Sequence, residues 1–171
     1  MESYGYEDVK ELGYRELRGF SGRSAWIIPH KNRVYLKAVN EVSEEECRQN
    51  HESLLRVLRS LREEGPEHID LIFDLVDTHS ADSEATKALL DAGDKILQDF
   101  PNLTMWLLGS DKSALWSDIL AFNPVPNPRV KGPCSDPALL ERLIDAMRGY
   151  SRAGTPVKAK DIGLIHQYAL Q

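Results

Sequence analysis

The sequence predicts a single α/β domain built on a mixed, mostly parallel sheet that an antiparallel hairpin opens. Short runs rich in Val, Ile, Leu and Phe alternate with longer amphipathic segments, which is typical of parallel strands joined by helices. Two β-rich runs come first, separated by a short polar turn, and this spacing favours a hairpin. The length of 171 residues suits one domain with short additions at its ends.

The hairpin is expected over 24–29 and 33–40. A helix follows, because Ser43 and Glu46 form a capping box and Gly65 lies just beyond the apolar stripe. The later elements are expected in this order: a strand over 68–77, a helix over 83–100, a strand over 103–108, a helix over 111–122, an edge strand over 129–131, a helix opened by Asp136-Pro137 and ended before Gly149, and a helix over 159–170.

These elements divide the chain into three parts. We expect residues 1–22 to form an N-terminal extension of mixed polarity and residues 23–150 to form the α/β domain. Residues 151–171 are expected to form a linker and a C-terminal helix. Helices that cross between the parallel strands are expected to pack against the sheet.

Charge and cysteine content exclude several classes of function. The formal net charge is −6 and the pI is about 5.4, which disfavours a nucleic-acid partner. Arg56, Arg59 and Arg62 share one helical face, and we interpret this face as a solvated surface. Cys47 and Cys134 lack the spacing of a metal site or a redox pair.

The sequence also disfavours a membrane partner. The N-terminus lacks the basic segment and apolar core of a secretory signal. The apolar runs are broken by Asp residues and are too short to span a bilayer. We therefore expect a cytoplasmic protein.

Several segments resemble the STAS domain, the fold of anti-sigma-factor antagonists and related bacterial regulatory modules. The matching pieces, within about residues 24–149, are RVYLKA (33–38), VSEEE (42–46), DLIFDLV (70–76) and LTMWLLG (103–109). The resemblance implies a STAS-like fold and a protein partner, either a kinase-like regulator or a second copy in a homodimer. It also implies a phosphoacceptor turn where Asp82-Ser83 stands, although Glu84 and Ala85 replace the Ser-Gly of the family. Ser83 and Ser80 are the phosphoacceptor candidates.

Polar residues gather where the strand over 68–77 ends, which is where open α/β sheets bind ligands. The residues are Asp74, Asp77, His79, Ser80, Asp82 and Ser83. They are compatible with a divalent cation, with a phosphoryl group on Asp77, or with phosphorylation of Ser83. The simpler interpretation is a structural role, in which Ser80 or Asp82 caps the next helix and Asp77 closes the strand.

Two hypotheses of function follow. The first is a non-enzymatic regulatory or protein-interaction module, without cofactor or metal, whose surface is the turn from Asp77 to Ser83 and the helix face over 84–97. The outward contacts of this surface would be Asp77, His79, Asp82, Glu84, Lys87 and Asp91. The alternative is a small-ligand- or metal-binding protein or enzyme that uses Asp74, Asp77 and the Gly109-Ser110 turn.

Overall fold

The computed structural model describes residues 11–20, 23–38, 40–81, 83–109 and 127–150. The elements are β1 (Arg15–Glu16), β2 (Arg23–Ile28), the 3-10 helix η1 (Pro29–Lys31), β3 (Arg33–Ala38), β4 (Asn40–Val42), α2 (Glu44–Glu63), β5 (Ile69–Asp74), β6 (Thr78–Ala81), α3 (Ser83–Asp99), β7 (Leu103–Leu108), β8 (Val130–Cys134) and α5 (Pro137–Arg148). The helices expected over 111–122 and 159–170, and the linker between 151 and 157, lie outside the described residues.

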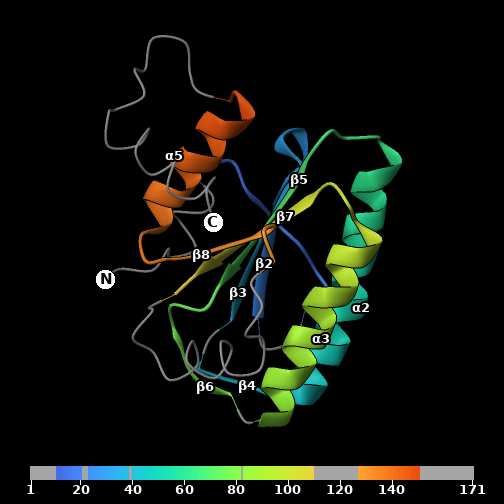
Figure 1. The fold of residues 1–171 in the computed structure, drawn as a ribbon, viewed down its shortest axis with the longest axis vertical. Helices are drawn as coiled ribbons and strands as arrows, with labels where there is room; N and C mark the ends of the chain where they lie inside the picture. The colour runs from blue at the N-terminus through green and yellow to red at the C-terminus, as the bar shows by residue number, and fades with distance from the viewer. Residues whose placement is uncertain (1–10, 21–22, 39, 82, 110–126, 151–171) are drawn as a thin grey trace.

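The sheet confirms the predicted α/β class. Six strands follow the order β1-β2-β3-β5-β7-β8. The pairs β1-β2 and β2-β3 are antiparallel, whereas β3-β5, β5-β7 and β7-β8 are parallel. Helices α2 and α3 lie side by side on one face, and α5 lies on the other (Figure 1). Among the described residues, no helix is both long and apolar enough to cross a membrane.

Local signals in the sequence define the helix ends. The Ser43 hydroxyl accepts a hydrogen bond from the Glu46 amide at 3.2 Å, as the capping box predicts. The Asp136 carboxylate accepts from the Leu139 amide at 3.2 Å and starts α5. Gly149 ends α5 with a φ of 76°, a conformation that glycine adopts without a Cβ clash.

Three short strands, β1, β4 and β6, are absent from the sequence-based prediction. They contain two, three and four residues, which is too few for an alternating pattern to be recognised. β1 pairs with β2, and β4 pairs with β6 in a separate two-stranded sheet. These strands therefore depend on pairing between distant segments.

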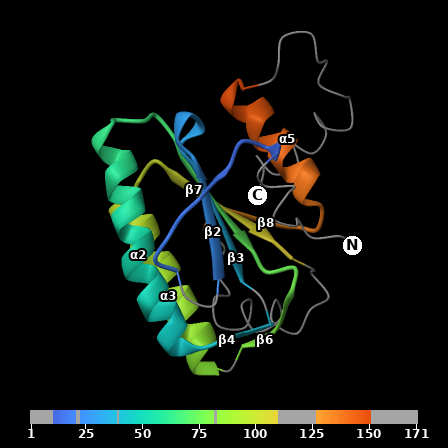
Figure 2. The ribbon, with the colours of Figure 1, turned by 180° about the vertical axis from the view of Figure 1, so that it is seen from behind.

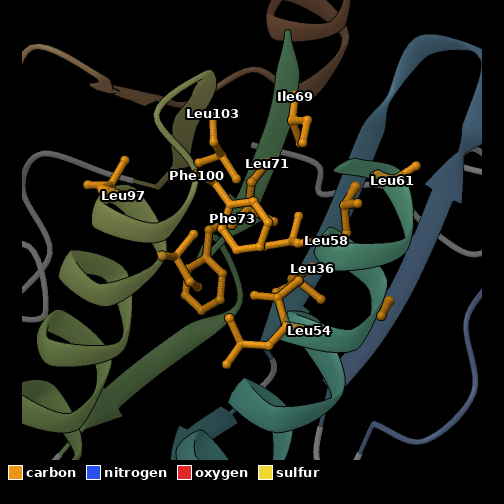
Figure 3. Packing of buried hydrophobic residues seen from close by; sticks show 14 of the residues in the cluster. Leu36, Leu54, Leu58, Leu61, Ile69, Leu71, Phe73, Leu97, Phe100 and Leu103 are labelled. Atoms are coloured by element: carbon orange, nitrogen blue, oxygen red, sulfur yellow. The ribbon is translucent and has the colours of Figure 1, made fainter. Parts of the chain in front are cut away.

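The two faces of the sheet differ in chemistry. The face under α2 and α3 is apolar, and Figure 3 shows Leu58, Phe73 and Phe100 packed between the helices and the strands. The opposite face also carries apolar residues, including Ile72 and Trp106, but buried charged residues lie among them. The buried charged residues of the described chain are Arg33, Asp70, Asp74 and Glu141.

Candidate functional site

Asp74 lies at the carboxyl end of β5, and both of its side-chain oxygens are engaged. The Tyr35 hydroxyl donates a hydrogen bond to Oδ2, and the Val76 amide donates to Oδ1 at 2.9 Å. Burial raises the pKa of the Asp74 carboxyl, while the hydrogen bond from Tyr35, that from Val76 and the charge of Lys37 act in the opposite direction. The side chain is thus part of the structural frame at this sheet edge.

The chain turns directly after Asp74. The Thr78 amide donates to the Leu75 carbonyl at 3.1 Å, which closes a four-residue turn. The Thr78 hydroxyl donates to the carbonyl of Ala38 at 3.1 Å, so the turn is also attached to the end of β3. β5 consequently ends earlier than expected, and Asp77 belongs to the turn.

Asp77 lies at the outer side of the turn and forms an ion pair. Its Oδ2 is 3.0 Å from Lys37 Nζ, and the side chain of Asp77 is 42% exposed. Lys37 comes from β3, next to β5 in the sheet. The structure therefore brings Asp74, Asp77 and Lys37 together. Of the two carboxylates, Asp74 is buried and Asp77 is exposed to solvent.

The predicted phosphoacceptor segment forms β6 and the start of α3. The backbone of Ser80 pairs with that of Glu41, and Ser83 is the first residue of α3. The side chains of His79, Ser80 and Ser83 lie outside the described part of the structure, as does the whole of Asp82. The fold thus displays this segment beyond the main sheet, next to β4 (Figure 1).

The predicted contact residues of α3 face solvent. The side chains of Glu84 and Lys87 are 70% and 54% exposed, and their charged atoms are 3.9 Å apart. Asp91 is exposed one turn further along the helix. Ala85 and Thr86 are buried on the inner side. Glu84, Lys87 and Asp91 thus lie on the outward side of α3, opposite Ala85 and Thr86.

Gly109 follows β7, the strand next to β5. Its amide donates to the Cys134 carbonyl at 2.9 Å, and a Cβ at Gly109 would lie 3.9 Å from the Leu75 Cβ. Ser110 lies outside the described residues. Where side chains are described, no three His, Cys, Asp or Glu residues gather as a metal site would require.

Sequence reasoning missed a second polar cluster, under α5. Arg33 Nη1 donates to Glu141 Oε2 at 2.7 Å, and the Tyr14 hydroxyl donates to Glu141 Oε1 at 2.5 Å. Burial raises the pKa of the Glu141 carboxyl, and the charge of Arg33 lowers it. The signal was present, since Glu141 lies four residues after Pro137 and three before Ile144, on the buried side of α5.

Neither a protein-family model nor a curated protein matches this chain.

Proposed function

We propose that this chain is a non-enzymatic regulatory or protein-interaction module of STAS-like type. Its working surface would be the segment from Asp77 to Ser83 together with the outward side of α3. We call this segment and the exposed residues Glu84, Lys87 and Asp91 the α3 surface. The partner would be a kinase-like regulatory protein or a second copy of the chain, in the cytoplasm.

One observation supports this proposal most directly. Buried polar groups fix the backbone of the turn over 75–78, where the α3 surface begins. Asp74 binds the Val76 amide, and Thr78 binds the Ala38 carbonyl. The inner polar groups are thus used to fix the backbone, while Asp77, Glu84 and Lys87 present charge to solvent. A fixed backbone that displays exposed charges suits recognition by another protein, because little conformational entropy is lost on binding.

A phosphate on Ser83 would change this surface strongly. Ser83 is the first residue of α3, where the helix dipole favours negative charge. Lys87 lies four residues later, at the spacing that allows side chains on a helix to interact. Phosphorylation would therefore add charge to the surface without disrupting the helix start. Ser80 is the second candidate acceptor.

The alternative, a ligand-binding protein or enzyme that uses Asp74, Asp77 and the Gly109-Ser110 turn, has less support. Both oxygens of Asp74 accept hydrogen bonds from the protein, so a ligand would have to displace Tyr35 or Val76. Asp77 retains partial exposure, but a single surface carboxylate paired with Lys37 binds ligands weakly.

Co-purification of the tagged protein from its native cell, with mass spectrometry of partners and of Ser80 and Ser83, tests the proposal. Glu84→Lys should abolish the recovered partner. Glu45→Lys is the matched control, because Glu45 is an exposed residue in the first turn of α2, as Glu84 is in α3. Both substitutions reverse one charge near the start of a helix, so both disturb the interaction with the helix dipole to the same extent. Equal recovery with both variants, or recovery of the protein alone, would contradict the proposal.

Light scattering separates the two kinds of partner. A second copy of the chain predicts a dimer that Glu84→Lys dissociates and Glu45→Lys leaves intact. A kinase-like partner predicts a monomer, with phosphate found on Ser83 in the cell-derived protein.

A further inference from the structure

Arg33 is fully buried at the start of β3, yet only part of its guanidinium has partners. Nη1 lies 2.7 Å from Glu141 Oε2 and 2.8 Å from Asp145 Oδ1. Nε and Nη2 are buried and have no hydrogen-bond partner among the residues that the structure describes. A buried donor without a partner is costly, so native structures contain few of them, and each one calls for an explanation.

The two unused donors are the pair that binds oxyanions. The Nε–H and Nη2–H bonds of an arginine point in parallel, and together they match the two oxygens of a carboxylate or phosphate. Arg148 uses this same pair within the molecule, since its Nε and Nη2 lie 2.9 Å and 2.8 Å from the two oxygens of Asp70. Asp70 therefore binds this donor pair of Arg148, whereas no acceptor in the described part of the chain binds the same pair of Arg33.

The charges around Arg33 decide what must accompany the binding of an anion. Arg33 and Lys31 face Glu141 and Asp145, with Lys31 Nζ 3.0 Å from Asp145 Oδ1, so the cluster is balanced when both carboxyls are ionised. Burial raises the pKa of Glu141, so this carboxyl takes up a proton more readily than an exposed one. An added negative charge can thus be compensated by protonation of Glu141.

Residues 11–20, which we call the strap, contact this cluster through Tyr14. Tyr14 of the strap shares the Glu141 carboxylate with Arg33 and packs its ring on Tyr35 at 5.6 Å. Arg15 and Glu16 pair with β2, the Leu17 amide donates to the Ala25 carbonyl at 2.7 Å, and the Ser53 hydroxyl donates to the Gly19 carbonyl at 2.8 Å. Gly13 and Gly19 have positive φ angles. Figure 2 shows the strap running from beside α5 to beside α2. Short pairing of this kind opens locally at low cost.

We propose that the Nε and Nη2 groups of Arg33 form a binding site for a small oxyanion, a carboxylate or a phosphate, which becomes accessible when the strap moves aside. The site lies under α5, apart from the α3 surface, and does not depend on the function proposed above. Tyr35 and Trp26, whose ring centroids are 5.9 Å apart, provide an aromatic environment next to the position of the Tyr14 ring. An aromatic carboxylate is therefore expected to bind better than acetate.

The test is a titration of the full chain with sodium benzoate, acetate or inorganic phosphate at constant ionic strength, followed by NMR of the arginine Nε–H groups. The Arg33 signal should shift and saturate. The Arg148 signal is the internal control and should stay in place, because Asp70 binds its donor pair. Benzoate alone would identify a carboxylate ligand, and phosphate alone would identify a phosphate ligand.

Two variants complete the experiment. Arg33→Lys keeps the charge but loses the donor pair, and binding should weaken by about tenfold or more. Tyr14→Phe loses the hydrogen bond to Glu141, so the strap opens more often and the apparent affinity should rise by roughly tenfold. Absence of any Arg33 shift in both the original protein and Tyr14→Phe would overturn the proposal. Equal shifts at Arg33 and Arg148 would also overturn it, whether or not Arg33→Lys folds.

Discussion

Asp74 is fully buried at the end of β5, and burial raises the pKa of its carboxyl. The folded state therefore binds a proton more tightly than the unfolded chain, so this group stabilises the fold at low pH and loses that contribution as pH rises through the raised pKa. We expect Asp74→Asn to remove this part of the pH dependence. The free energy of unfolding of both proteins is measured by urea unfolding across the acid range. Its slope against pH should differ between them by up to about 1.4 kcal/mol per pH unit.

The sign of this difference decides the result. Other carboxyls titrate in both proteins and cancel, so only the Asp74 contribution remains. A stability difference that does not change with pH, or one that changes in the opposite direction, would mean that the Tyr35 and Val76 hydrogen bonds outweigh burial.

Substitutions at Gly132 and Gly149 distinguish the cost of a steric clash from the cost of backbone strain alone. Both have positive φ, of 125° and 76°. A Cβ at Gly132 would lie 2.5 Å from the Leu107 carbonyl oxygen, whereas a Cβ at Gly149 would meet nothing within 4 Å. Gly149→Ala should cost about 1 kcal/mol and Gly132→Ala about 3 kcal/mol or more, measured by chemical unfolding. Equal losses would mean that β7 moves aside easily.

At the scale of elements, α5 is attached to the sheet by a buried ion pair. Arg148 binds both oxygens of Asp70, and Trp106 Nε1 donates to Asp70 Oδ1 at 2.9 Å. Arg148→Met should cost about 3–5 kcal/mol in unfolding free energy, because it leaves the Asp70 charge buried without its partner. In the double variant Asp70→Asn with Arg148→Met, part of this loss should be recovered. Additive losses would contradict the pairing.

The elements that the sequence predicted correctly are those with local signals. The start of α2 is marked by Ser43 and Glu46, and α5 is marked by Asp136 at its start and Gly149 at its end. Each of these signals lies at the helix end itself, so no distant contact is needed to recognise it. β4 and β6 carry no comparable signal, because each strand exists through pairing with the other, about 40 residues away along the chain.

The location of the candidate site could be predicted from the sequence, but the contacts of its residues could not. The ends of parallel strands had to meet at one edge, so the neighbourhood of Asp74, Asp77 and Gly109 followed from the strand order. The role of Asp74 did not follow, because its partner Tyr35 is 39 residues away and lies on another strand. Arg33 and Glu141 are 108 residues apart, and nothing local in the sequence relates them.

At the scale of the whole molecule, the two faces of the sheet have different kinds of stability. Apolar packing under α2 and α3 involves many interchangeable contacts, as in the cluster around Leu58. The face under α5 relies on Arg33, Asp70 and Glu141, which need specific partners. Loss of one partner on this face leaves a buried charge, so substitutions of its charged residues should be the more damaging.

Hydrogen exchange should reveal the strap as the least stable part of the sheet region. The Leu17 amide donates to the Ala25 carbonyl at 2.7 Å, and this bond breaks whenever the strap lifts. Ile72 lies in β5, which has neighbours on both sides, so its amide exchanges only through global unfolding. We expect Leu17 to exchange much faster than Ile72.

Tyr14→Phe should accelerate exchange at Leu17 by roughly tenfold, because the strap loses its hydrogen bond to Glu141. Exchange at Ile72 should follow only the smaller change in global stability. If Leu17 and Ile72 were equally protected in the original protein, the strap would open only when the whole domain unfolds. Arg33 would then have no route to a ligand in the folded protein, so this measurement also decides whether the oxyanion site can be reached.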